Sequence, residues 1–154
     1  MIRHVKAALV AGVAGAVVPL LSIAPARAED STVYFAMNSG SFQCSIGADG
    51  TVGCDTSPKQ MSMKIAGITL PMLIPVHAVV IDVGWAPAHP GFDSGTPHTL
   101  PGGNPNLSDV ATGHGQWGPS ISYAGATCEG GFHGSISCRS KGHSFSYYEI
   151  IAAD

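Results

Sequence analysis

Basic side chains are scarce in this sequence, and three of its seven Lys and Arg residues stand before residue 28. Between residues 29 and 154, four Lys and Arg face ten Asp and Glu, a formal charge of −6. Nucleic acids and anionic membrane surfaces are bound through clusters of Lys and Arg. We therefore expect neither of them to be a partner of this part of the chain.

The motifs of several enzyme classes are also missing. The sequence has no C-x-x-C, no H-E-x-x-H and no G-x-S-x-G, and its Gly-rich stretches lack the strand-to-helix setting of a phosphate-binding loop. These absences argue against thiol redox chemistry, zinc proteases, α/β-hydrolases and nucleotide-binding enzymes. The sequence thus favours a non-enzymatic protein that needs no cofactor.

Long stretches free of Gly and Pro are lacking, because 20 Gly and 11 Pro are spread over the chain. A helix of ordinary length has no place to form. Short β-rich runs end at Gly or Pro instead, and they predict an all-β fold, a small antiparallel sandwich or barrel in a single domain over 29–154. These runs are 31–37, 62–67, 77–85, 120–125 and 143–152.

The first 28 residues have the pattern of a secretory signal peptide. Arg3 and Lys6 precede an apolar run over 7–23, and Ala26-Arg27-Ala28 offers a cleavage site. The alternative is an uncleaved membrane anchor, but the run is shorter than the ~20 residues of a spanning helix. We expect cleavage after Ala28, no stable membrane insertion afterwards, and a secreted or cell-envelope location.

Two stretches of eleven residues share one pattern, C-x-x-G-x-x-G-[ST]-[VI]-x-C. They are "CSIGADGTVGC" at 44–54 and "CEGGFHGSISC" at 128–138. In the first, residues 48–50 fit a three-residue hairpin loop that ends on a left-handed glycine, and residues 132–134 occupy the same place in the second. Each stretch is therefore predicted to be a β-hairpin.

The hairpin register predicts the disulfides. Counting back from each loop places Cys44 opposite Cys54 and Cys128 opposite Cys138, in each case at a non-hydrogen-bonded pair where side chains approach most closely. Cysteines of an exported chain meet an oxidising compartment, so an even number favours disulfides over catalysis. The pairings 44–54 and 128–138 are preferred, with the two crossed pairings as alternatives.

A long excursion from residue 84 to 119 has no sustained period, with Gly or Pro every few residues. It is nevertheless not a polar linker, because large apolar side chains are scattered through it. We expect an ordered loop packed over the sheet, with a short helical turn at 106–112 and at least one of the two tryptophans buried beneath it. Its large apolar residues are Trp85, Phe92, Leu100, Leu107 and Trp117.

Two hypotheses for a site arise from this excursion. In the first, the protein is a monomer that binds an unknown protein or small ligand, because Trp and Tyr are favoured at recognition surfaces. The candidate binding residues are Trp85, His114, Gln116, Trp117 and Tyr123. In the alternative, it is a secreted metal-dependent hydrolase, although the histidine spacing is irregular and these side chains can equally be surface or structural ones. The candidate ligands are His89, His98 and His114.

Three segments resemble small secreted proteins of mycobacteria and related actinobacteria. They are the alanine-rich leader, "SFQCSIGADGTVGCD" at 41–55 and "CRSKGHSFSYYEI" at 138–150. The group shares a cysteine-bounded hairpin near the start of the mature chain, and a final cysteine pair followed by G-H-x-F. The resemblance implies an exported, disulfide-bonded protein of the cell envelope or culture medium, and it implies neither a reaction nor a catalytic residue.

Overall fold

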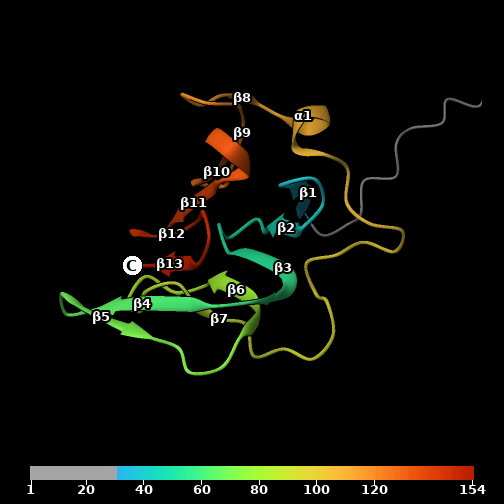
Figure 1. Cartoon of the computed structure of the whole chain (residues 1–154). Helices are drawn as coiled ribbons and strands as arrows, with labels where there is room; N and C mark the ends of the chain where they lie inside the picture. Colours follow the sequence, from blue (N-terminus) through green and yellow to red (C-terminus); the bar gives the residue numbers. More distant parts are fainter. Residues whose placement is uncertain (1–30) are drawn as a thin grey trace, which may run out of the picture.

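The computed structural model describes residues 31–154, which form two β-sheets with very little helix (Figure 1). This confirms the predicted all-β class, with a correction of detail: the sheets remain separate and do not close into a barrel. The predicted signal peptide, residues 1–28, lies outside the described residues. Within residues 31–154, no helix is long and apolar enough to cross a membrane.

One sheet has five strands in the order β1-β2-β3-β6-β7, and the other has eight in the order β5-β4-β13-β12-β11-β10-β9-β8. All neighbours are antiparallel except β4 and β13. The helical elements are α1 (Leu107–Val110) and a 3-10 turn (Phe132–Gly134). The strands are β1 (Val33–Met37), β2 (Phe42–Ile46), β3 (Val52–Lys59), β4 (Met61–Ile65), β5 (Ile68–Pro71), β6 (Val76–Ile81), β7 (His89–Pro90), β8 (Gly113–His114), β9 (Pro119–Tyr123), β10 (Ala126–Gly130), β11 (Ile136–Ser140), β12 (His143–Tyr147) and β13 (Ile151–Ala153).

The core lies between the inner faces of the two sheets. Side chains alternate along the strands, so that Phe145 on β12 is buried while its neighbours Ser144 and Ser146 face outward. Phe35 and Phe42 bring the largest side chains from the five-stranded sheet, and both are fully buried. This alternation leaves each sheet with an outer face, and the two outer faces are of different character.

Both predicted disulfides are present and buried in this core. Cys44 pairs with Cys54 directly across β2 and β3, and Cys128 pairs with Cys138 across β10 and β11. Gly50 has a φ of 80° at the end of the first loop, as the register requires. The two hairpins therefore form as predicted from their local sequence alone.

The segment 143–152, predicted as one strand, is two strands joined by a turn at 148–150. Tyr147 and Ile151 face each other across this turn, and neither Gly nor Pro marks it in the sequence. The second correction is β5, which the sequence analysis did not predict: it follows β4 after the turn at 66–67, and all four of its residues are exposed. β5 pairs only with β4, at the edge of the larger sheet.

Part of the excursion, around His98, packs on the outer face of the five-stranded sheet as predicted, and residues 107–110 form the expected helical turn. The rest is not all loop: β7 adds a short strand to this sheet and β8 adds one to the other sheet. Ala36 on the edge strand β1 donates its backbone N–H to the Pro105 carbonyl, at 2.7 Å. The expectation of a buried tryptophan is wrong, since Trp85 is 85% exposed and Trp117 is 64% exposed. The polar side chains of Ser45 and Asp55 lie beneath the excursion instead, and they bond to His98 and Thr99.

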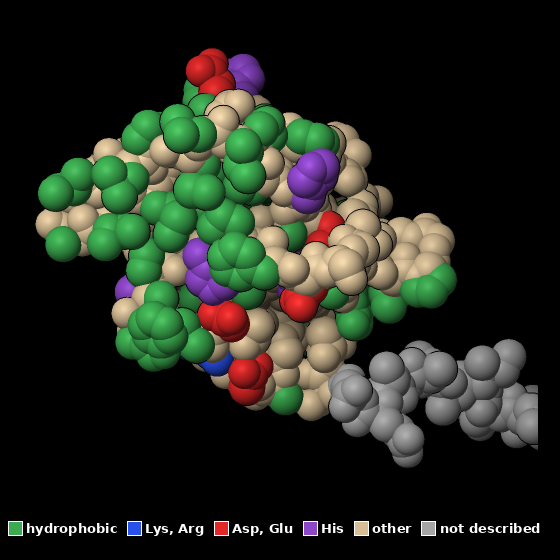
Figure 2. Space-filling view, turned by 90° about the horizontal axis from the view of Figure 1, so that it is seen from below, with side chains coloured by type: hydrophobic (Ala, Val, Ile, Leu, Met, Phe, Trp, Pro, Cys, Tyr) green, Lys and Arg blue, Asp and Glu red, His purple; other side chains and the backbone are tan. Residues whose placement is uncertain are grey.

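Exposed apolar side chains gather near the β4–β5 hairpin. Figure 2, which views the molecule from below Figure 1, shows hydrophobic side chains over much of this face and out along the hairpin at its left. Leu73, in the connection from β5 to β6, is 94% exposed. The other large apolar side chains of the hairpin and this connection that are exposed are Ile65, Ile68, Leu70 and Ile74.

Candidate ligand-binding site

The predicted binding residues do not form one site. His114 ends β8, and Gln116 and Trp117 follow in the turn to β9, so these three are neighbours. Tyr123 ends β9, roughly 20 Å from Trp117 along extended chain, and it packs against the core. Trp85 follows Gly84, which lies against the turn between β11 and β12 at the opposite end of the large sheet. Only His114, Gln116 and Trp117 remain together.

The three candidate metal ligands do not converge either. His89 and His98 lie over the outer face of the five-stranded sheet, on either side of β6, whereas His114 belongs to the other sheet. In the part of the chain that the structure describes, no group of three or more His, Cys, Asp or Glu is arranged to hold a metal ion. Within residues 31–154, the geometry therefore does not support a metal centre built from His89, His98 and His114.

His89 and His98 instead have structural partners. His89 bonds the Asp82 carboxylate through Nε2 at 3.0 Å and the Pro90 carbonyl through Nδ1 at 2.8 Å. Burial lowers the pKa of His89, but the bonds to Pro90 and Asp82 raise it more, so that the net shift is upward. Nδ1 of His98 is hydrogen-bonded to Oγ of Ser45 at 2.8 Å. Burial lowers the pKa of His98, although the charges of Asp55 and Asp93 act to raise it.

Asp55 and Asn104 hold the excursion near His98. The Asp55 carboxylate accepts the backbone N–H of His98 at 2.8 Å and the hydroxyl of Thr99 at 2.7 Å. Asn104 Nδ2 lies 2.9–3.2 Å from three carbonyl oxygens, those of Phe35, Cys44 and His98. The polar groups of the excursion are therefore used to fasten it to the sheet.

The outer face of the eight-stranded sheet carries a different surface, which we call the hydroxyl face. Because the strands are in register, small polar side chains line up across them. One row crosses β4, β13, β12, β11 and β10 through Ser62, Ala152, Ser146, Ser137 and Glu129.

A second row of the hydroxyl face runs beside the first. It begins at Asp154, whose backbone is hydrogen-bonded to that of Ser144, and it crosses β12, β11, β10 and β9. Its members are Asp154, Ser144, Arg139, Thr127 and Ser122. The large apolar residues of these strands point the other way, into the core. This face therefore offers serine and threonine hydroxyls close to the backbone, together with a few charged side chains.

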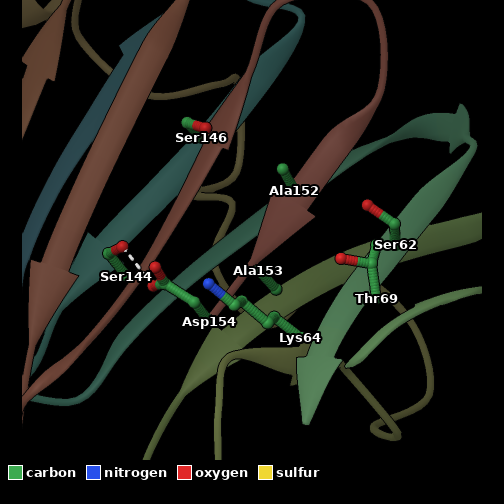
Figure 3. Close-up of a pocket in the computed structure, with 8 residues that line it drawn as sticks. All are labelled: Ser62, Lys64, Thr69, Ser144, Ser146, Ala152, Ala153 and Asp154. Atoms are coloured by element: carbon green, nitrogen blue, oxygen red, sulfur yellow. Dashed lines mark hydrogen bonds between the residues drawn. The ribbon is translucent and has the colours of Figure 1, made fainter. Parts of the chain in front are cut away.

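The hydroxyl face is hollowed where β4, β12 and β13 meet (Figure 3). Ser144 donates to the Asp154 carboxylate at the floor of this hollow. Lys64 and Thr69 reach into it from β4 and β5 on one side, and Ser146 lies farther along β12. With Ser62 of β4, the hollow thus combines four hydroxyls, one cation and one carboxylate without a bulky apolar wall.

Aromatic side chains stand along one end of the hydroxyl face. The turns β8–β9, β10–β11 and β12–β13 all lie at this end, and each presents one aromatic residue: Trp117, Phe132 and Tyr148. All three are more than 60% exposed, and the rings of Trp117 and Phe132 are 5.8 Å apart between centroids. We call these three residues the aromatic rim.

Two glycines place Trp117 in the rim. Gly115 donates its N–H to the Gly118 carbonyl at 2.8 Å and so closes the turn that carries Trp117. A β-carbon at Gly118 would lie 3.0 Å from the Gly130 carbonyl oxygen, and one at Gly115 would meet the Glu129 carboxylate. Glycine at 118 therefore lets the turn approach the backbone of β10 closely, and glycine at 115 leaves room for the Glu129 side chain.

A second hollow connects the aromatic rim to the hydroxyl face. Trp117 and Tyr148 line it together with Glu129, Ser137 and Ser146. Ser146 also lines the hollow of Figure 3, so the two hollows share a residue of β12. The rim and the hydroxyl face therefore form one surface that runs across the strands.

Charges on this surface nearly cancel. Arg139 pairs with Glu129, with Nη2 3.3 Å from Oε1, and Lys64 enters the same hollow as Asp154. The surface therefore differs from the chain as a whole, in which residues 29–154 carry a formal charge of −6. The surface thus has no excess of one charge.

Of the residues that form this surface, only Trp117 was predicted from the sequence to be a binding residue. The sequence did contain a sign of the hydroxyl face, because Ser alternates with aromatic residues over 143–147. This alternation was interpreted as a strand with one buried face, and not as a binding face. Phe132 was placed correctly in its hairpin loop, and Tyr148 was assigned to a strand. No protein-family model, no curated protein and no solved structure matches this chain.

Proposed function

We propose that this chain is an exported, non-enzymatic binding protein, and that its ligand lies on the hydroxyl face against the aromatic rim. The single observation that carries the proposal is the surface on which Trp117 and Tyr148 share a hollow with Ser137 and Ser146. Exposed aromatic residues on rigid turns, next to polar groups on rigid strands, are the usual components of a recognition surface. The Cys128–Cys138 disulfide joins β10 and β11 of the hydroxyl face, and two buried disulfides suit an oxidising location.

A catalytic role has less support from the same contacts. Among residues 31–154, one serine bonds a histidine, Ser45 with His98, and Ser45 is buried beneath the excursion where no substrate has access. On the hydroxyl face, Ser144 bonds a carboxylate and Ser122 bonds Thr127, and neither has a histidine partner. These arrangements position side chains but do not activate a nucleophile.

The two tryptophans provide the test, because one lies in the proposed site and the other at the far end of the sheet. A W85F variant keeps Trp117 as the sole indole, and the matched W117F variant keeps Trp85. Each would be titrated with three defined classes of probe: soluble polysaccharides, a hexapeptide library and uncharged phosphatidylcholine vesicles. We expect one class to shift the fluorescence of Trp117 and to leave that of Trp85 unchanged.

A response of Trp85 alone would move the site away from the aromatic rim and contradict the proposal. The absence of any response from Trp117, with all three classes at millimolar concentration, would also contradict it. Near-UV circular dichroism of both variants checks that the fold is retained.

A further inference from the structure

We infer that the ligand of the hydroxyl face is an uncharged polysaccharide chain that lies across the strands, from the aromatic rim toward the hollow of Figure 3. This inference rests on the proposed function and names its ligand class. It is carried by three features of the surface: its repeated hydroxyl groups, its aromatic end and its balanced charge.

The hydroxyl groups repeat with the strands. Neighbouring strands lie about 4.8 Å apart, a spacing close to the length of one sugar residue in a chain. Ser137 and Ser146 are adjacent in one row, and Ser62 follows two strands farther along. A serine hydroxyl donates one hydrogen bond and accepts two, which matches the mixed donor and acceptor character of sugar hydroxyls.

Several of these hydroxyls are free to bind a ligand. Ser144 is used by Asp154, and Ser122 by Thr127. Ser62, Ser137 and Ser146, in contrast, have no hydrogen-bond partner for their side chains within residues 31–154, although Ser62 and Ser137 are half-buried. Partly desolvated hydroxyls without partners gain more from a polyhydroxylated ligand than fully hydrated ones do.

The aromatic rim supplies the second component. Sugar rings present apolar C–H groups on their faces, and aromatic rings bind such groups while leaving the sugar hydroxyls free to reach polar side chains. Trp117 and Tyr148 line one hollow together with Ser137 and Ser146. A sugar placed there would contact a ring and a hydroxyl at once.

Other ligand classes match the surface less well. An extended peptide binds an open strand edge through its backbone, but β10 to β13 are interior strands with both edges paired. An anionic polymer needs unpaired cations, whereas Arg139 is paired with Glu129 and Lys64 shares its hollow with Asp154. An uncharged polyol needs neither an open strand edge nor an unpaired cation.

Affinity electrophoresis would test the inference with the mature chain. The gels would contain a β-1,3-glucan, dextran, a galactomannan or an arabinan, with polygalacturonate as an anionic counterpart. We expect at least one neutral polysaccharide to retard the wild-type protein more than polygalacturonate does. The substitution W117A should weaken this binding at least tenfold, and the double substitution S137A/S146A severalfold. W85A is the matched control, and it should bind as the wild type does.

The outcomes separate this inference from the proposed function. If polygalacturonate retards the protein more strongly, or if Trp117 responds to peptides alone, the ligand is not a neutral polysaccharide. The binding site of the proposed function would then still stand. Retardation that neither W117A nor S137A/S146A reduces would overturn both. A full effect of W117A with none from S137A/S146A would also contradict the inference, because a polyol ligand requires the hydroxyls.

Discussion

The imidazole of His98 occupies the space above Gly53 where a β-carbon at that position would have to lie. Gly53 is the second residue of β3, and its neighbours on this outer face are Ser45 and Val80. The long excursion can approach the sheet here because the strand leaves room for a ring. We therefore expect G53A to destabilise the protein by about 2 kcal/mol through overpacking.

The double variant G53A/H98A distinguishes this steric conflict from a general effect on β3. Urea unfolding of the wild type, both single variants and the double variant forms a cycle. We expect the cost of G53A to be smaller by ~1 kcal/mol or more when His98 is absent. Equal costs in the two backgrounds would mean that the imidazole does not occupy the space above Gly53.

Asn104 should be a main anchor of the excursion, because its amide bonds carbonyl oxygens of β1, β2 and the excursion itself. We expect N104A to lower the free energy of unfolding by roughly 1–3 kcal/mol, since buried carbonyl groups lose their donor. Hydrogen exchange of residues 98–104 should accelerate more than that of β2. N106A is the control: Asn106 is exposed, and its side chain makes no capping hydrogen bond to α1.

His98 should make stability depend on pH. Its pKa is below the ordinary value of 6.5 because the ring is buried, so the unfolded chain takes up the proton first as the pH falls. Stability therefore declines below about pH 6.5, down to the pKa of the folded state. His89, whose pKa is raised, contributes in the opposite direction: its stabilisation is present below 6.5 and is lost as the pH rises through its folded pKa.

Urea midpoints between pH 5 and 8 would separate the two histidines. The variant H98Q should lose the decline in stability below about pH 6.5. H89Q should instead lose the gain in stability that the wild type shows as the pH falls from 8 toward 6.5. The measured quantity is the slope against pH rather than the absolute stability, so a uniform loss in either variant does not affect the comparison. A wild-type slope that H98Q leaves unchanged would assign the pH dependence to other groups.

The disulfides should contribute independently, because each closes its own hairpin with a sequence separation of 10. We expect C44A/C54A and C128A/C138A each to lower the free energy of unfolding by about 2–3 kcal/mol. C128A/C138A should also loosen the turn that carries Phe132, and thereby weaken any ligand binding at the aromatic rim. C44A/C54A lies in the other sheet and should leave that binding within twofold.

What could be predicted from the sequence was local. The hairpins at 44–54 and 128–138 followed from turn glycines and strand register, which depend on neighbouring residues only. The contacts of His98 and Asn104 could not be predicted, since Ser45, Gly53 and Asp55 on a strand give no sign of what will lie above them. The turn at 148–150 was hidden because its residues have ordinary strand propensity.

The candidate site was hard to predict for a similar reason. Trp117, Phe132 and Tyr148 are separated by many residues, and only the order of strands in the sheet brings their turns to one end. The serines of the hydroxyl face looked like the solvent side of ordinary strands. Cross-strand register turns these scattered residues into rows, and register between distant strands is not encoded in any single segment.

The parallel pairing of β13 with β4 has a consequence for how the molecule is assembled. Residues 61–71 join the large sheet only through residues 151–153, because β13 separates them from β12. While the chain is still emerging, β4 and β5 have no neighbouring strand of the large sheet apart from each other, and Ile65, Ile68 and Leu70 face solvent. The complete sheet can form only once β13 has been released, so truncation before Ile151 should leave the β4–β5 hairpin detached.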